Sequence, residues 1–137
     1  MGDVRLSADP LDASAAMASV AHPSYPAAAL FVGTVRDDSA TRRVVSLEYE
    51  AFTELAEAEM RAICDEVAER HGARCALVHR TGVVRVGEPS VIAAVCAVSY
   101  RVAMTACEYV VDELKARVPV WKLQTFADGG AEWAEGA

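Results

Sequence analysis

The sequence predicts an α+β or α/β domain built around two main helices. Two segments, Thr53 to His71 and Val102 to Arg117, repeat apolar residues at the three- and four-residue spacing of a helix. Short segments lie before, between and after these helices. In some of them apolar and polar residues alternate, and others are apolar throughout, both of which are typical of strands. Helices and strands therefore interleave along the chain. Since the chain has 137 residues and no repeat or linker, we expect one domain covering residues 1–137.

The first half of the chain is predicted to hold a short helix, two strands and the first main helix. Pro10 to Ala21 is the short helix, with the proline in its early turn. Ala27 to Arg36 is a buried strand that leads into a polar turn, and Val44 to Ala51 alternates as a half-exposed strand does. The apolar face of the helix from Thr53 to His71 consists of Ala56, Met60, Ile63 and Val67.

The second half is predicted to hold three strands and the second main helix. Cys75 to Arg80 is a strand, and Thr81 to Ser90 is rich in turn residues. Val91 to Val98 is apolar throughout, which indicates a central strand covered on both faces. After the helix from Val102 to Arg117, the segment from Val120 to Phe126 is a last strand before a turn and a short tail. The apolar stripe of that helix is predicted to be Met104, Cys107, Val111, Leu114 and Val118.

Composition excludes several classes of function. The net charge of −7 argues against binding to nucleic acid or to an acidic membrane. No apolar run is long enough to span a bilayer and no signal peptide is visible, so we expect a cytoplasmic protein. The four cysteines lack the spacing of metal ligands, which predicts buried free thiols and no metal site.

Lysine is rare in this chain. Lys115 and Lys122, on either side of Pro119, are the only two lysines beside eleven arginines. Each has a structural interpretation: Lys115 neutralises the C-terminal end of a helix, and Lys122 points outward from a strand. Arginine would serve both roles. An amine, unlike a guanidinium, can lose its proton and then act as a base or a nucleophile, so a chemical role is the second interpretation. Two neighbouring amines would lower each other's pKa.

Two arginines at the ends of predicted elements are candidates for holding an anion. Arg36 ends a strand, and Arg101 lies where the second main helix begins, next to free backbone amides. The alternative for each is a surface residue that aids solubility. Together with the lysines they favour a phosphate-bearing substrate. His79 has no nucleophile near it in the sequence, so we expect a core or surface histidine, and no glycine-rich nucleotide loop is present.

Four stretches carry a resemblance to a known family. They are FVGTVRDDS (residues 31–39), LEYEA (47–51), VHRTG with the following VGE (78–88), and the long block YRVAMTACEYVVDELKARVPVWK (100–122). In these stretches the chain resembles the MoaE family, the large catalytic subunits of molybdopterin synthase. The resemblance runs over most of the sequence. It implies an α+β fold with a hammerhead-like arrangement, a mixed or antiparallel sheet and two main helices.

The resemblance also implies an activity. Family members convert cyclic pyranopterin monophosphate into molybdopterin, which carries a dithiolene. The sulfur comes from a thiocarboxylate on the C-terminal glycine of a small ubiquitin-like partner, and two partner turnovers supply two sulfurs. No metal or other cofactor is implied. The large subunit is expected to form a homodimer with one small subunit at each end, giving a heterotetramer.

Site residues follow from the same resemblance. Lys115 and Lys122 correspond to the two catalytic lysines. The expected substrate-binding residues are Thr34, Val35, Arg36, Tyr100, Arg101, Leu123 and Gln124. Arg101 corresponds to an arginine of an anion pocket that the family builds across the dimer interface.

Two positions depart from the family pattern. Tyr100 stands where the family usually has histidine, and Gln124 stands where an acid is common. A phenol still donates a hydrogen bond but does not become a cation near neutral pH. The alternative function is therefore a catalytically weakened paralogue that only binds the small subunit. A lysine enzyme that forms a Schiff base is a third possibility, without support from the predicted fold.

Overall fold

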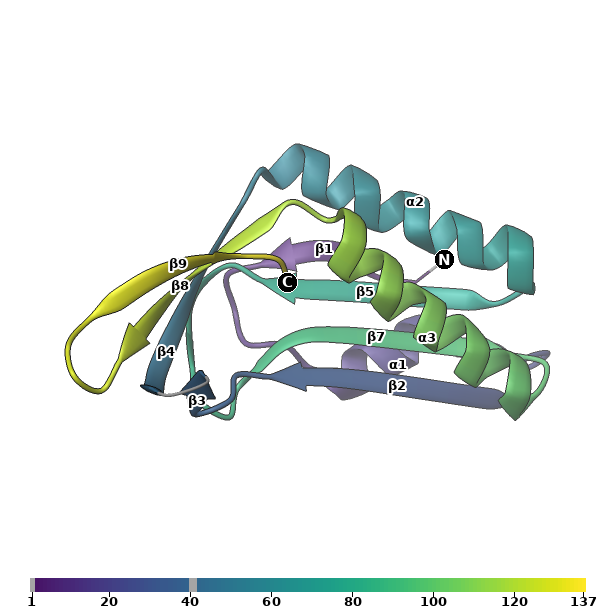
Figure 1. Cartoon of the computed structure of the whole chain (residues 1–137). Coiled ribbons are helices and arrows are strands. Elements are labelled where there is room, and N and C mark those ends of the chain that lie inside the picture. The colour runs from purple at the N-terminus through teal and green to yellow at the C-terminus, as the bar shows by residue number, and fades with distance from the viewer. Residues whose placement is uncertain (1, 40–41) are drawn as a thin grey trace.

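The first of two sheets is mixed and four-stranded. The computed structural model describes residues 2–39 and 42–137 (Figure 1). In this part of the chain the strand order is β1-β5-β7-β2, with β1 and β5 parallel and the other neighbours antiparallel. The bounds of these strands are β1 Val4–Ser7, β2 Ala27–Thr34, β5 Arg74–Arg80 and β7 Pro89–Ala97.

A second, antiparallel sheet lies at one end of the first (Figure 1). Its order is β3-β4-β8-β9, and β6 also pairs with β4. The β8–β9 hairpin extends away from the helices at the left of Figure 1. The bounds are β3 Asp38–Ser39, β4 Arg42–Ala51, β6 Gly82–Arg85, β8 Val120–Phe126 and β9 Ala131–Glu135.

Three helices cover the two faces of the first sheet. The short helix α1 (Ala13–Val20) packs on one face, and α2 (Thr53–His71) and α3 (Tyr100–Arg117) pack on the other. The Asp12 carboxylate accepts a hydrogen bond from the Ala15 amide at 3.2 Å and so caps α1. Gly72 ends α2 with a φ of 61°, a conformation that glycine adopts without strain.

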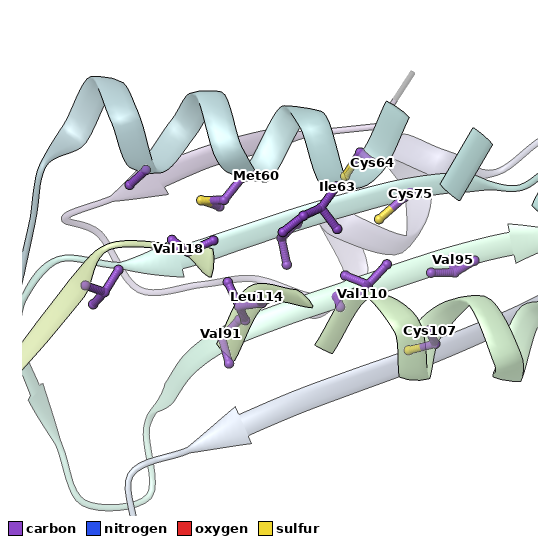
Figure 2. Packing of buried hydrophobic residues seen from close by; sticks show 14 of the residues in the cluster. Met60, Ile63, Cys64, Cys75, Val91, Val95, Cys107, Val110, Leu114 and Val118 are labelled. Carbon is purple, nitrogen blue, oxygen red and sulfur yellow. The ribbon is translucent and has the colours of Figure 1, made fainter. Parts of the chain in front are cut away.

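The main core lies between α2, α3 and the first sheet. Figure 2 shows side chains from both helices gathered over β5 and β7, among them Met60, Ile63 and Leu114. These three side chains are buried almost completely. On the opposite face, Val20 of α1 packs in a smaller cluster with Ile92 of β7. The predicted central strand is therefore confirmed as one that is covered on both faces.

Arg117 ties the end of α3 to α2. Its guanidinium donates to the Glu66 carboxylate at 2.8 Å through two nitrogens, to Glu59 at 3.0 Å and to Glu113 at 3.1 Å. The pKa of Glu66 falls to about 2 because of hydrogen bonds from Arg117 and then from Tyr109. This cluster fixes the last turn of α3, the turn that also carries Lys115.

The structure confirms the α+β class, the two main helices and all the predicted strands, and it corrects several details. The helix expected from Val102 begins at Tyr100, because the Ser99 hydroxyl accepts a hydrogen bond from the Val102 amide at 3.3 Å. Met104 was predicted to be buried but is 62% exposed. The buried face instead consists of Ala103, Ala106, Cys107, Val110 and Leu114.

Four strands were not predicted from the sequence. These are β1, β3 in the predicted polar turn, β6 within the stretch predicted as turns, and β9 in the predicted tail. Each of these strands is short. It is defined by hydrogen-bonded pairing with a neighbouring strand and not by an alternating pattern in its own sequence. In the polar turn predicted after Arg36, β3 pairs antiparallel with the start of β4, and residues 40 and 41 of that turn lie outside the described residues. The short helix begins at Ala13, so Pro10 precedes it.

All four cysteines are buried and free, as predicted. None of the helices in the described ranges combines the length and the apolar character needed to cross a bilayer.

Candidate active site

A pocket of about 310 Å³ lies where the two sheets meet. It is lined by residues from the end of β2, from β4 and β8, from the start of β7 and from the last turn of α3. Six of the nine site residues predicted from the sequence line it, namely Thr34, Val35, Arg36, Lys115, Lys122 and Gln124. These residues are up to 90 positions apart in the chain, so the fold itself brings them together.

The corner at Pro119 places both lysines at the pocket. Helix α3 ends at Arg117, and the Val118 amide closes its last turn by donating to the Leu114 carbonyl at 3.1 Å. The chain then turns and enters β8 directly. Along β8 Val120 and Phe126 are buried, and Lys122 and Gln124, which share their side of the strand, reach the pocket. Lys122 pairs with Tyr49 of β4 in the sheet register.

Lys122 is the amine with the more perturbed environment. It is half-buried, so the structural interpretation of Lys122, as a residue that points outward from its strand, is wrong. Burial lowers its pKa, and the positive charges of Lys115 and then Arg36 lower it further. Neither lysine forms an ion pair with a carboxylate of the described residues. A larger fraction of the Lys122 amine is therefore uncharged near neutral pH than in an ordinary lysine.

Arg36 is free to hold an anion at the mouth of the pocket. Its side chain is 80% exposed, and its single ion pair within the described ranges is a 3.9 Å contact from Nε to the Asp38 carboxylate. An ion pair of this length between exposed groups contributes little free energy, so it does not hold Arg36 in place. The pocket is lined by three cations, Arg36, Lys115 and Lys122, and by one carboxylate, Asp38, in a protein whose net charge is −7.

The floor of the pocket is apolar, with two hydroxyl groups. Val44, Leu47 and Val91 contribute the apolar surface, and Tyr49 and Ser90 contribute the hydroxyls. The Ser90 hydroxyl donates to the Gly33 carbonyl at 3.3 Å, and burial raises the pKa of Tyr49. We did not predict Tyr49 and Ser90 as site residues. For Tyr49 the one indication in the sequence was its place among the apolar positions of an alternating strand. No pattern in the sequence indicated Ser90.

Gly33 also lines the pocket, and it pairs with Val91 of the neighbouring strand β7. A Cβ atom at this position would lie 2.8 Å from Cγ1 of Val91. Glycine at this position therefore leaves room for the Val91 side chain of the neighbouring strand.

His79 lies behind the pocket rather than in it. It is fully buried, its Nδ1 donates to the Arg80 carbonyl at 2.7 Å, and its ring meets that of Tyr49 edge-on at 4.9 Å between centroids. Burial lowers its pKa to about 4, so the ring is neutral near neutral pH. This confirms a core histidine.

Tyr100, Arg101 and Leu123 do not line this pocket. Tyr100 and Arg101 start α3, and Lys115 follows Tyr100 by 15 residues, which is about 22 Å along a helix axis. They cannot reach the lysines of their own chain. Leu123 alternates with Lys122 along β8, so its side chain faces the opposite side of the sheet.

No metal centre accompanies these residues in the described part of the chain. Within residues 2–39 and 42–137, no group of three or more His, Cys, Asp or Glu side chains is placed to hold a metal ion.

Comparison with known proteins gives matches over most of the chain. Residues 6–117 match the family model for the MoaE protein. The molybdopterin synthase catalytic subunit of Culex quinquefasciatus is 40% identical over 136 residues, which cover 96% of this chain and 87% of that protein. The subunit of the same name from Bos taurus is 41% identical over 115 residues, which cover 83% of this chain. The aligned part is 61% of the Bos taurus protein, so the chain spans about three fifths of the length of that relative.

The fold agrees with these sequence matches. The X-ray structure of molybdopterin synthase from Staphylococcus aureus superposes with a TM-score of 0.92, covers 98% of both chains and is 28% identical in sequence. The matched segment, residues 6–117, includes Arg36 and Lys115. The chain therefore belongs to the MoaE protein family.

Proposed function

We propose that this chain is the catalytic subunit of a molybdopterin synthase. Its reaction is sulfur transfer to cyclic pyranopterin monophosphate from the C-terminal thiocarboxylate of a small ubiquitin-like subunit. The observation that carries the proposal is the convergence of Lys115, Lys122 and Arg36 on one pocket. The volume of that pocket, about 310 Å³, is at the lower end of the range for small-molecule sites.

Each of the three cations has a distinct role in this proposal. Arg36 holds the phosphate through charge-assisted hydrogen bonds. Once the carrier sulfur has bonded to the pterin, Lys115 assists attack of water on the carbonyl carbon, which breaks the acyl C–S bond and releases the carrier as its carboxylate. Lys122 takes up and returns a proton. Thr34, Val35 and Gln124 surround the substrate. The Tyr49 and Ser90 hydroxyls form hydrogen bonds with its polar groups. The sulfur comes from the partner, so the proposal includes no metal or organic cofactor. It also includes a cytoplasmic location and a single domain.

The direct test is a single-turnover reaction. The protein is mixed with the cyclic pterin precursor and a thiocarboxylated small subunit, and molybdopterin is measured. Product formation supports the proposal. Binding of the small subunit without product favours the second candidate, a module that binds the carrier but lacks turnover. Gln124 favours that candidate, because a neutral amide lines the pocket where a charged group would assist Lys122. Absence of both binding and product contradicts both candidates.

The pH dependence of the reaction should reflect Lys122. If its uncharged amine accepts a proton, the single-turnover rate rises with pH through the lowered pKa of this group. Replacing Arg36 with Gln removes one of the charges that lower this pKa. We expect the rising limb of the profile in Arg36→Gln to move to higher pH at saturating substrate. Arg43→Gln, at an exposed position that does not line the pocket, is the matched control. Identical profiles for Arg36→Gln and wild type would contradict the assignment.

We also propose a homodimer formed through the outer surface of β2 and α3. Strand β2 is at the edge of its sheet, and Leu30, Tyr100 and Met104 are 45%, 66% and 62% exposed. Leu30 and Met104 also line an apolar hollow of about 330 Å³. Exposed apolar groups that gather in this way are typical of an interface. In this assembly Arg101 contributes to the site of the other copy, and one small subunit binds at each end.

Replacing Met104 with Glu should yield a monomer, because a buried carboxylate without a partner disfavours association. Light scattering after size-exclusion chromatography measures the mass. Leu55→Glu is the control, since Leu55 is 54% exposed on a different helix. A monomeric wild type, or a Met104→Glu variant of dimeric mass, would count against this interface.

A further inference from the structure

A turn outside the pocket holds the residue that precedes Arg36. This turn joins β6 to β7, and the Glu88 amide closes it by donating to the Arg85 carbonyl at 3.0 Å. Gly87, the third of its four residues, has a φ of 86°, a value that favours glycine at that place. The motif VGE (86–88), part of a stretch that carries the family resemblance, thus forms a turn, and none of its residues lines the pocket.

The Glu88 side chain closes the same turn a second time. Its carboxylate Oε1 accepts a hydrogen bond from the Arg85 amide at 2.8 Å, where β6 ends. A hydrogen bond to an ionised carboxylate is stronger than one between neutral groups. Glu88 therefore fixes the shape of the turn with both its backbone and its side chain.

The turn holds Val35 through two backbone hydrogen bonds. The Val35 amide donates to the Glu88 carbonyl at 3.1 Å, and the Gly87 amide donates to the Val35 carbonyl at 2.8 Å. These bonds continue the pairing of β2 with β7 beyond Thr34 and Pro89, at the place where Figure 1 shows the end of β2 beside the start of β7. The backbone of Val35 is therefore fixed on both sides of its Cα atom.

Arg36 depends on this backbone for its direction. Its side chain is 80% exposed, and the 3.9 Å contact with Asp38 is its one ion pair among the residues that the structure describes. On the far side of Arg36, the Asp37 carbonyl accepts a hydrogen bond from the Val44 amide at 2.7 Å. Since no firm side-chain partner holds the guanidinium, a shift of Val35 moves Arg36 relative to the lysines of the pocket.

We propose that Gly87 and Glu88 are positioning residues, which hold Arg36 where it binds the substrate phosphate and do not themselves contact the substrate. The inference rests on the proposed function. The turn does not carry the two amines, because Lys115 lies in α3 and Lys122 in β8. Damage to the turn should therefore weaken binding of the precursor and leave the rate at saturating precursor nearly unchanged.

The test measures the affinity for the cyclic pterin precursor by isothermal titration calorimetry and the single-turnover rate at saturating precursor. Glu88→Ala loses the side-chain hydrogen bond to Arg85, and we expect it to bind the precursor about five-fold more weakly than wild type. Glu88→Gln keeps an oxygen that accepts this bond, so its affinity should stay within about two-fold of wild type. The saturating rate of both variants should stay within about two-fold of wild type. Glu69→Ala, at an exposed position of α2, is the control for loss of a carboxylate.

Two glycine variants test the turn without changing any charge. Gly87 and Gly129 have φ values of 86° and 90°, and a Cβ atom at either position would meet no atom within 4 Å. Alanine at either position therefore introduces backbone strain without a clash. Gly87→Ala should weaken precursor binding by about five-fold. Gly129 lies in the β8–β9 turn and does not line the pocket, so Gly129→Ala should match wild type.

A double variant separates positioning of Arg36 from a general loss of structure. In an Arg36→Gln background the residue to be positioned is gone, so adding Glu88→Ala should change the affinity by less than about two-fold. A further loss of about five-fold in this background would overturn the inference, because Glu88 would then act through another group. The melting temperature of each variant is measured in parallel.

Several results would overturn the inference and leave the proposed function standing. They are wild-type affinity in both Glu88→Ala and Gly87→Ala, equal weakening in Glu88→Gln and Glu88→Ala, and equal weakening in Gly129→Ala and Gly87→Ala. A fall in the saturating rate as large as the fall in affinity would also overturn it. Failure of the wild type to bind the precursor and to form molybdopterin would contradict the proposed function and this inference together.

Discussion

Replacing Lys115 with Arg is expected to slow the single-turnover formation of molybdopterin by about 100-fold or more, the range for loss of one acid–base or nucleophilic group. The positive charge in the last turn of α3 is kept, so its favourable interaction with the helix end remains. What is lost is an amine that can exchange a proton or attack a carbonyl. Product is quantified after a single mixing of enzyme, precursor and thiocarboxylated carrier.

Two controls separate chemistry from folding in that experiment. The melting temperature and the affinity for the carrier should both stay at wild-type values in Lys115→Arg. Arg43→Lys, a like change between cations at a position that does not line the pocket, should keep the wild-type rate. If the rate for Lys115→Arg is within a factor of about three of the wild-type rate, only the positive charge of Lys115 matters, and it has no acid–base or nucleophilic role.

Replacing Ile63 with Ala should lower the free energy of unfolding by about 2–5 kcal/mol. Ile63 is fully buried between α2 and the strands, so its removal loses apolar burial and leaves a cavity (Figure 2). The midpoint of thermal unfolding should fall by roughly 10 °C for a domain of this size. Differential scanning calorimetry and urea unfolding measure the two quantities.

The matched control for this stability prediction is Leu55→Ala on the same helix. Leu55 is 54% exposed, and its truncation should change the free energy of unfolding by no more than about 0.5 kcal/mol. Similar losses for Ile63→Ala and Leu55→Ala would mean that the face of α2 has been assigned incorrectly.

The long amphipathic elements could be predicted from the sequence because their own pattern defines them. The helix α2 has the predicted bounds and the predicted buried residues, since each repeat of Met60, Ile63 and Val67 adds to the same face. For the helix α3, the predicted apolar face is shifted by about one residue from the face that is buried in the structure. Its small residues, Ala103 and Ala106, are buried, and the larger Met104 remains on the surface.

The site could be predicted only in part. The unusual use of lysine pointed to Lys115 and Lys122, and the pocket contains both. Tyr49 and Ser90 reach the same pocket through strand pairing between distant segments, which no local pattern reveals. Tyr100 and Arg101 were grouped with the lysines by family resemblance, whereas the length of α3 separates them within one chain.

The strand order has a consequence for how the protein reaches its folded state. In the first sheet Thr34 pairs with Pro89 and Ala27 with Ala97, separations of 55 and 70 residues. In the second sheet Ala51 pairs with Val120, a separation of 69 residues. Contacts this distant along the chain form slowly, on a scale of milliseconds to seconds. During synthesis neither sheet can close until the segments from residue 89 onward have emerged. The pocket, whose lining comes from β2, β4, β7 and β8, is therefore completed late in folding.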